Sequence, residues 1–256
     1  MTGAVTDELT VVRAGYAPIK GTRHLARDQV RFDAKGVVGD RGFALVSLDD
    51  GDPGHGRVVR TVQHPALVAV HAEQVGGRLD VVLPDGRSAS AEPTVTGEHV
   101  VCDYWGREVD LELVGGPHAD LFSEYLGRPV RLARAQRGEV IFAGSVSVVT
   151  TSSVRELARQ TANDDLDPAR FRPNLVVETD EPFAEDDWLG QEFRVGEATL
   201  RIGGPIPRCA VIDARPETGE RDVRLLKALV SSRPTNRAGE PMFGVFAEVV
   251  TPGAVG

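Results

Sequence analysis

The sequence has few cysteines, no long apolar run and no excess of positive charge. Its 256 residues include two cysteines, Cys102 and Cys209, which argues against a disulfide framework and predicts reduced thiols. The formal net charge of -9 at pH 7 argues against a nucleic-acid partner, because DNA-binding and RNA-binding proteins present a basic face. No apolar stretch is long enough to span a bilayer, and the opening residues MTGAVTDELT lack the regions of a secretory signal. We therefore expect a cytoplasmic protein without a membrane span.

The common catalytic motifs are missing as well. The sequence contains no GxGxxG after a strand, no GxxxxGK[ST], no GxSxG and no HExxH,. Its six histidines are dispersed without metal-ligand spacing, so a zinc site is not expected,. The acidic run Glu185, Asp186 and Asp187 beside Trp188 is typical of a solvated turn or a helix start. Acid–base catalysis by these carboxylates is not expected.

Short runs rich in Val and Leu, separated by Gly, Pro and Asp, dominate the chain. They predict strands at residues 9–16, 41–48, 67–73, 78–84, 107–114, 129–135, 145–150, 174–178, 198–204 and 242–250,. Helical spacing predicts helices at 118–127, which closes with Gly127, at 152–161, where Ser153 and Glu156 match a capping box, and at 221–232,. The Gly, Pro and Asp of residues 48–59 predict a mobile hairpin loop,. Many strands with scattered helices predict a β-rich α+β fold with barrel-like architecture.

Two short stretches carry candidate site residues. In RFRPNLVVE, residues 170–178, Pro173 favours an extended chain and a strand beginning near Leu175,. Arg172 and Asn174 at this strand entrance are either structural hydrogen-bonding groups or ligand contacts, and both interpretations stay open here.

In GGPIPRCAVID, Cys209 follows a turn rich in Gly and Pro, and the adjacent Arg208 favours the thiolate, which is the nucleophilic and metal-binding form,. The alternative is a buried cysteine that packs as a small hydrophobe. Cys102, flanked by apolar residues in HVVCDYWG, is expected to be such a buried cysteine.

Several longer segments resemble a known family. RFRPNLVVE, DDWLGQEFRVGEATLRIGGPIPRCAVIDARPETGERD and MFGVFAEVVTPGAVG resemble the MOSC domain, the C-terminal domain of molybdenum-cofactor sulfurases. YAPIKG, GVVGDRGFALVSLDDG and VRTVQHPALVAV resemble the N-terminal β-barrel domain that accompanies MOSC in the mitochondrial amidoxime-reducing component and its bacterial relatives. The resemblance implies an N-terminal β-barrel-like domain over residues 1–135, a MOSC β-barrel with a few helices over residues 136–256, and a cofactor cleft where the two meet.

The resemblance also implies a set of residues that bind the molybdenum cofactor, a pyranopterin dithiolene with a phosphate. Guanidinium and amide groups suit such a planar, anionic ligand, and hydroxyls at a helix start can hold a phosphate. A thiolate suits a thiophilic metal. The implied cofactor contacts are Lys20, Arg41, Thr151, Ser152, Arg172, Asn174 and Arg208, and the implied molybdenum ligand and catalytic residue is Cys209. Gly21 departs from the family pattern, where serine is frequent, which puts one cofactor hydrogen bond in doubt.

The activity implied by this resemblance is the molybdenum-dependent reduction of N-hydroxylated small molecules. The chain stops soon after its MOSC-like tail, so we expect no iron–sulfur cluster in it and a separate electron-donor protein of ferredoxin or flavoprotein type. Pyridoxal phosphate is not required. Two alternatives stay open: a non-catalytic carrier of molybdenum cofactor or of persulfide sulfur on a cysteine, and a degenerate domain that keeps only the fold.

Overall fold

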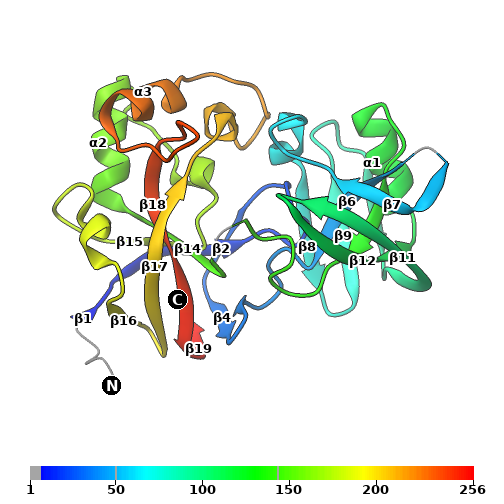
Figure 1. Ribbon diagram of the computed structural model, residues 1–256, viewed down its shortest axis with the longest axis horizontal. Helices are drawn as coiled ribbons and strands as arrows, with labels where there is room; N and C mark the ends of the chain where they lie inside the picture. The colour runs from blue at the N-terminus through cyan, green and yellow to red at the C-terminus, as the bar shows by residue number, and fades with distance from the viewer. Residues whose placement is uncertain (1–6, 50, 143) are drawn as a thin grey trace.

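The computed structural model describes residues 7–49, 51–142 and 144–256 and has two lobes (Figure 1). The barrel lobe contains strands β6 to β13 and helix α1. The sheet lobe contains strands β1 to β5 and β14 to β19 with helices α2 and α3. Within the described residues, no helix is both long and apolar enough to cross a membrane.

An eight-stranded sheet forms the centre of the sheet lobe. In spatial order its strands are β1 (Asp7–Glu8), β16 (Glu192–Val195), β17 (Ala198–Pro207), β18 (Met242–Thr251), β14 (Val146–Thr150), β15 (Leu175–Val177), β2 (Val11–Tyr16) and β3 (Leu25–Arg27). A small sheet of β19 (Gly253–Val255), β4 (Val30–Asp33) and β5 (Gly36–Val37) lies beside it. Strands from the two ends of the chain therefore pair with one another in both sheets.

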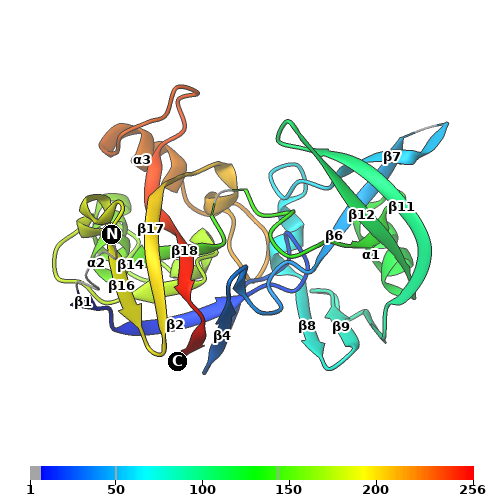
Figure 2. The same cartoon turned by 60° about the horizontal axis from the view of Figure 1, so that its bottom comes forward.

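The core of the sheet lobe is also built from both ends of the chain. Phe32 and Val37, from β4 and β5, are buried in the same hydrophobic cluster as Leu175, Val245 and Val255. Figure 2 shows β2 running along the base of the sheet lobe toward the barrel lobe. Strands β1 to β5, within residues 7–37, are thus an integral part of the lobe that residues 144–256 complete.

The barrel lobe is a closed five-stranded barrel with a smaller sheet beside it. The barrel strands are, in order, β11 (Thr94–Tyr104), β12 (Arg107–Gly115), β13 (Arg131–Arg134), β6 (Phe43–Asp49) and β7 (Asp52–Val58). The smaller antiparallel sheet has the order β10 (Ser88–Ala91), β9 (Arg78–Val82) and β8 (His71–Val75). Alternating buried residues along β12, among them Val109, Leu111 and Leu113, fill the barrel interior,.

Three α-helices and four short 3₁₀ helices complete the described fold: α1 (His118–Leu126), α2 (Thr151–Thr161), α3 (Leu225–Ser232), η1 (Pro65–Ala69), η2 (Pro168–Phe171), η3 (Ala184–Trp188) and η4 (Ala210–Asp213). Helix α1 ends where the sequence predicts, because Gly127 takes the left-handed conformation with φ of 64°,. Helix α3 begins later than predicted, at Leu225, where the Asp213 carboxylate accepts a hydrogen bond from the Leu226 amide at 2.9 Å.

The predicted β-rich α+β fold is confirmed, and most predicted strands lie within two residues of an observed one. Two local predictions are wrong. Residues 67–73 were expected to form one strand, but Pro65 starts a 3₁₀ helix and the strand begins only at His71,. Residues 52–58 were expected to be loop, but they form β7, which pairs with β6 and also closes the barrel against β11.

The cap of α2 also differs from the prediction. Thr150, rather than Ser153, is the N-cap, and its hydroxyl accepts a hydrogen bond from the Ser153 amide at 3.3 Å,. Glu156 does not reach back to the helix start, because it pairs with Arg159 one turn further on, at 2.7 Å.

Candidate functional site

Two of the predicted site residues lie on segments that cross between the lobes. Tyr16 and Leu25 pair within the sheet lobe, but between them Ile19 forms a bridge to Phe43 of the barrel lobe, and the Lys20 amide donates to the Phe43 carbonyl at 2.8 Å. The chain therefore leaves the sheet lobe, touches the barrel lobe and returns. Lys20 lies where this segment contacts the barrel lobe.

Arg41 lies on the second crossing segment, between β5 and β6. Its amide donates to the carbonyl of Ala17 at 2.8 Å, which joins this segment to the one that carries Lys20. The two basic residues predicted in the first half of the chain, Lys20 and Arg41, thus lie at the junction between the lobes.

Arg41 and Arg172 both have the left-handed backbone conformation, with φ of 47° and 53°. Side chains other than that of Gly rarely adopt this conformation, and the strain that it stores is concentrated at functional sites. Arg172 takes it as the C-cap of η2, directly before the Pro173 of the strand entrance. The sharp turn sends its side chain toward the first half of the chain.

Asp40 joins the two halves of the site. The residue is 3% exposed; one side-chain oxygen accepts from the Ala17 amide at 3.2 Å, and the other from the Asn174 amide group at 3.1 Å. Arg41 forms an ion pair with the same carboxylate at 3.0 Å. Asp40 therefore holds Arg41 and Asn174 in fixed positions.

Asn174 is itself fully engaged within the protein. Its amide nitrogen also donates to the Gly15 carbonyl at 3.3 Å, and its oxygen accepts from the amide and the hydroxyl of Ser147, each at 3.0 Å. The residue is buried. In this arrangement Asn174 fixes the strand entrance to β2 and to Asp40 and does not present a free amide.

Arg172 contacts the loop that follows Lys20. Its guanidinium donates to the backbone carbonyls of Gly21, at 3.4 Å, and of Thr22. Gly21 has φ of 96°, and a Cβ there would lie 2.9 Å from the Thr61 hydroxyl. The loop conformation thus explains why Gly stands at position 21, since any side chain would be strained and crowded.

The charges of these residues are close enough to affect one another. Burial, together with the cations Arg41 and Arg172, lowers the pKa of Lys20 from 10.5 to about 7, and electrostatic attraction to Cys209 and Asp40 opposes this shift. Burial and the Arg41 guanidinium also lower the pKa of Arg172 to about 10. Three cations from separate segments are therefore crowded into one place, with Asp40 as a partial counter-charge.

The cluster also explains the state of a neighbouring histidine. His24 is buried, and burial followed by the charge of Arg172 holds its pKa well below the ordinary value. Neither ring nitrogen has a hydrogen-bond partner among the described residues. The ring is therefore neutral near pH 7 and adds no further cation to the cluster.

Cys209 is exposed and reduced, at the N-cap position of η4. The exposed thiol contradicts the alternative of a buried packing cysteine at this position. Cys102 is buried, as expected, and burial raises the pKa of its thiol to about 11. The two cysteines therefore differ sharply in access.

Arg208 points inward although its neighbour Cys209 is exposed. Its Nε and Nη1 donate to the carbonyls of Phe243, at 2.8 Å, and Phe171, at 2.9 Å, whereas Nη2 is buried without a hydrogen-bond partner among the described residues. Burial lowers the pKa of Arg208 to about 10, opposed by the charge of Cys209. A Cβ at Gly244 would lie 2.6 Å from the Val148 carbonyl oxygen and 3.1 Å from Nη2, so glycine permits the close packing beside this guanidinium.

Thr151 and Ser152 have different partners from the other predicted residues. Strand β14 carries the chain from Ser147, beside Asn174, to the start of α2, a distance of roughly 13 Å for four residues at strand rise,. The hydroxyl of Ser152 donates to the Glu181 carbonyl at 2.7 Å, and that of Thr151 to the Thr179 carbonyl at 3.4 Å. The structure therefore does not bring these hydroxyls into contact with the cationic cluster.

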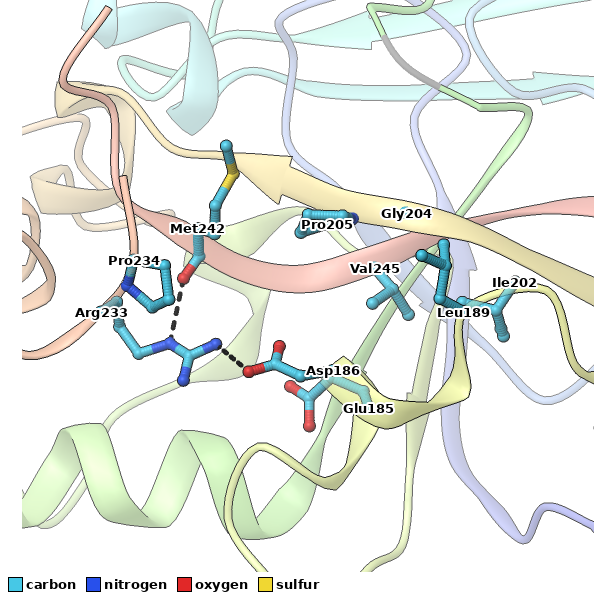
Figure 3. A pocket seen from close by; sticks show the side chains of 10 residues that line it. All are labelled: Glu185, Asp186, Leu189, Ile202, Gly204, Pro205, Arg233, Pro234, Met242 and Val245. Atoms are coloured by element: carbon cyan, nitrogen blue, oxygen red, sulfur yellow. Dashed lines mark hydrogen bonds and ion pairs between the residues drawn. The ribbon is translucent and has the colours of Figure 1, made fainter. Parts of the chain in front are cut away.

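A cavity of about 190 Å³ lies elsewhere in the sheet lobe (Figure 3). Its walls include Leu189, Ile202 and Val245, and an ion pair between Arg233 and Asp186, at 2.5 Å, closes one end. None of the predicted cofactor contacts lines it. The space is a mainly apolar gap between η3, β17 and β18.

One residue of the acidic run beside this cavity is buried, whereas Asp186 and Asp187 are exposed. Glu185 is 1% exposed, and one of its oxygens accepts from the hydroxyls of Thr150 and Ser153, each at 2.9 Å. Burial raises the pKa of Glu185. Of the two interpretations of this run, the helix start is the one observed, because Glu185, Asp186 and Asp187 form the first turn of η3. The solvated turn does not apply to Glu185, which η3 places under the start of α2.

Two residues of the site were not predicted from the sequence. For Asp40 the sequence offers one signal, since an acidic residue directly precedes the predicted basic contact Arg41. The other is Tyr104: the Nζ of Lys20 lies 5.1 Å from the centroid of its ring. Among the described residues, no group of three or more His, Cys, Asp or Glu side chains could hold a metal ion.

The residues brought together fit an anionic, metal-containing cofactor better than a bare metal. Burial and then repulsion by Arg41 and Arg172 lower the pKa of Lys20, and a bound anion would offset both effects,. The Nη2 of Arg208 is a donor without a hydrogen-bond partner among the described residues, and the exposed thiol of Cys209 is a soft ligand,. A phosphate, a polar ring system and a thiophilic metal would each meet suitable groups here.

Sequence comparisons agree with this architecture. The sequence profile of the MOSC N-terminal beta barrel domain matches residues 9–129, and that of the MOSC domain matches residues 133–256. The mitochondrial amidoxime-reducing component 1 of Danio rerio is 29% identical over 209 residues, which cover 72% of this chain and 61% of that protein. A molybdenum cofactor sulfurase of Danio rerio is 26% identical over 203 residues, which cover 68% of this chain.

The chain spans only part of these curated relatives: 23% of the sulfurase and 61% of the amidoxime-reducing component. Among solved structures, the YUAD protein from Bacillus subtilis aligns over 96% of this chain and 90% of its own, with a TM-score of 0.44 and 13% identity. The two domain matches are consecutive and together extend over nearly the whole sequence. The chain is therefore a member of the MOSC family, with a MOSC N-terminal beta barrel domain followed by a MOSC domain.

Proposed function

We propose that this protein is a molybdenum-cofactor-dependent reductase of N-hydroxylated small molecules. The observation that carries the proposal is the convergence of Lys20, Arg41 and Arg172 at the junction of the lobes. The exposed Cys209 is close enough to this cluster to influence the pKa of Lys20. The similarity to a mitochondrial amidoxime-reducing component supports the reaction type. The reaction would convert an N-hydroxylated compound into the corresponding N–H compound and water with two electrons and two protons.

The residues divide into groups that hold the cofactor and groups that position them. Lys20, Arg41 and Arg172 would bind the cofactor phosphate. Three basic groups and one carboxylate leave a net positive charge, which the phosphate would neutralise. Asp40 and Asn174 would act as positioning residues, because their hydrogen bonds fix Arg41 and the strand entrance. These roles do not require Asn174 to contact the ligand.

The second half of the chain would supply the metal contact. The Sγ of Cys209 would ligate molybdenum, and the free Nη2 of Arg208 would hydrogen-bond to an acceptor on the cofactor. When bound, the cofactor supplies the two-electron redox chemistry, while the protein orients it and neutralises its charge. We do not assign Thr151 and Ser152 to the phosphate in this proposal, since their hydroxyls have partners in the segment after β15.

The electrons would come from a separate protein of ferredoxin or flavoprotein type. Among the described residues, the free cysteines are Cys102 and Cys209, and no cluster of cysteines suits an iron–sulfur centre. Free thiols persist in the reducing cytoplasm, which is the location that we propose.

A second candidate function is a non-catalytic carrier of the cofactor or of persulfide sulfur. The exposed thiol of Cys209 favours it, since a persulfide carrier needs an accessible sulfur, and several relatives are named molybdenum cofactor sulfurases. In that case Cys209 would hold a labile sulfur atom, and the protein would show no turnover.

Replacement of each cysteine separates these functions. The protein is produced in a host that makes molybdenum cofactor, and its molybdenum content and dye-driven reduction of benzamidoxime are measured. In the reductase, Cys209→Ala removes activity and retains much of the pterin, because the basic contacts remain, whereas Cys102→Ala is the matched control and keeps both. Turnover at the normal rate by Cys209→Ala with molybdenum bound would refute the thiolate-ligand role. Loss of only a labile sulfur, with no turnover in the unmodified protein, would establish the carrier.

A further inference from the structure

A large hollow on the barrel lobe lies outside the proposed cofactor site. Its volume is about 710 Å³, and it is bounded by the β6–β7 hairpin, residues 60–64 and the turn between α1 and β13. Its basic side chains are Arg57, Arg60, His64, Arg128 and Arg131. Asp49 is the single acid among the described lining residues. We refer to this region as the arginine groove.

The arginines of the groove are only loosely paired. Arg57 lies 3.9 Å from Asp49, Arg131 lies 3.6 Å from Glu98 at the groove edge, and Arg128 donates to the hydroxyl of Ser47 at 3.1 Å. Such exposed contacts neutralise little charge. A local concentration of positive charge on a chain with a formal net charge of -9 produces a field that attracts an anionic partner.

An exposed aromatic pair lies at the tip of the neighbouring β11–β12 hairpin. Trp105 is 53% exposed and Phe142 is 48% exposed, and their rings meet edge to face with 4.9 Å between centroids. Trp105 has a left-handed backbone with φ of 56° at the hairpin turn. Contact between water and two large apolar rings is unfavourable. Binding of a partner that covers both rings would remove this cost and so stabilise the complex.

Arg60 connects the aromatic pair with the groove. It lines the groove, and its guanidinium carbon lies 5.2 Å from the centroid of the Trp105 ring. Tyr104, the neighbour of Trp105, has the Nζ of Lys20 over its ring at 5.1 Å. The groove, the aromatic pair and the proposed cofactor site are therefore consecutive along one path on the molecule.

We propose that the arginine groove and the Trp105–Phe142 pair together form the docking surface for an acidic electron-donor protein. The proposal rests on the reductase function proposed above. Exposed Trp and Phe surrounded by Arg is the composition that protein interfaces favour. Each encounter with a one-electron donor oxidises that donor by one electron, and two encounters supply the two electrons that reduction of one N-hydroxylated molecule consumes; the two protons come from water.

A protein partner fits these features better than a small polyanion does. The hollow is about 710 Å³ in volume, and its arginines Arg57 and Arg128 are exposed to a partner. The aromatic pair adjoins the groove through Arg60, and a partner that covers both rings as well as the rim needs an extended surface. Steering by charge would bring the donor to the junction, and the rings would provide its apolar contact.

The test uses an acidic plant-type [2Fe–2S] ferredoxin as the probe. Its dissociation constant for the protein is measured by calorimetry at about 20 mM and about 300 mM NaCl. The variants are the double charge reversal Arg57→Glu with Arg128→Glu, the single replacement Trp105→Ala, and Arg237→Glu, an exposed charge reversal of the sheet lobe, as the matched control. Dye-driven reduction of benzamidoxime is measured for each as an independent check on the cofactor site.

We expect the double reversal to raise the dissociation constant at least roughly tenfold at low salt, and Trp105→Ala to raise it about fivefold or more at both salt concentrations. The control should change it less than about twofold, since it lies in the other lobe. Dye-driven activity should be unchanged in all three variants, because none of these residues touches the proposed cofactor site.

Three results would overturn the docking proposal. The first is an equal loss of ferredoxin binding in the control and in the double reversal. The second is groove-dependent binding of inorganic pyrophosphate with no binding of ferredoxin, which would assign the groove to a small polyanion. The third is a change in the KM of aryl substrates in Trp105→Ala with an unchanged ferredoxin affinity. Loss of dye-driven activity in the unmodified protein would refute the reductase function instead, while the binding measurements would still decide on the docking surface.

Discussion

Replacement of Lys20 by methionine should stabilise the cofactor-free protein near neutral pH. The pKa of Lys20 falls from 10.5 in a solvated chain to about 7 in the folded protein, and at about 1.4 kcal/mol per pKa unit this corresponds to at most roughly 5 kcal/mol against folding. Methionine has a similar length and no charge, but it loses the contact of the ammonium group with the Tyr104 ring. We therefore expect a gain of about 2–4 kcal/mol at pH 7.

The pH dependence distinguishes this cause from a simple gain in packing. The folded protein binds the Lys20 proton less tightly than the unfolded chain does, so the full cost is present below pH 7 and disappears as the pH rises toward 10.5,. Chemical denaturation at intervals between pH 6 and pH 10 measures this, with Lys227→Met on the exposed face of α3 as the control. A variant that is less stable than the unmodified protein at pH 7, or a stability difference that is constant with pH, would refute the reasoning.

Three further predictions concern the neighbours of Lys20. Arg172→Ala should weaken molybdenum retention about tenfold or more, because a charge-assisted hydrogen bond contributes roughly 1.5–3 kcal/mol; full metal content after gel filtration would contradict it. Asp40→Ala should lower the free energy of unfolding by about 3 kcal/mol, since it leaves the Arg41 charge and the Asn174 amide without their buried partner,, and unchanged denaturation would contradict it. Gly21→Ser should cost roughly 1–3 kcal/mol because of its φ of 96° and the contact with Thr61,, whereas improved cofactor retention at equal stability would show that the family serine fits here.

The β-rich fold was predictable because its signals are local. Val- and Leu-rich runs between Gly and Pro mark strands, and Gly127 marks a helix end, so most elements are found from a few neighbouring residues,. The error at residues 67–73 has the same origin, since the apolar run looks like a strand and only Pro65 indicates the 3₁₀ helix that interrupts it. Pairing of β2 with β15, over 160 residues away, has no local signal at all.

For the candidate site, the family motifs identify individual residues in the sequence but not the contacts between them. Lys20, Arg41 and Arg172 come together in the structure, as the resemblance implies for cofactor contacts. Their relation through Asp40 could not be read from the sequence, because it depends on hydrogen bonds among three distant segments. The prediction for Thr151 rests on its position at a helix start. A helix start alone does not indicate whether the residue lies close to the other predicted contacts.

The pairing of the first strands with the last ones has a consequence for biosynthesis. Strand β4 pairs with residues 253–255, and β2 pairs with residues 175–177. During translation, the early strands must therefore wait, with their hydrogen-bonding edges open, until more than a hundred further residues have left the ribosome. The barrel lobe can form in the meantime, since its strands are close in sequence. The junction that carries Lys20, Arg41 and Arg172 forms only at the end of synthesis. A cofactor that binds there must therefore be inserted after translation and not during it.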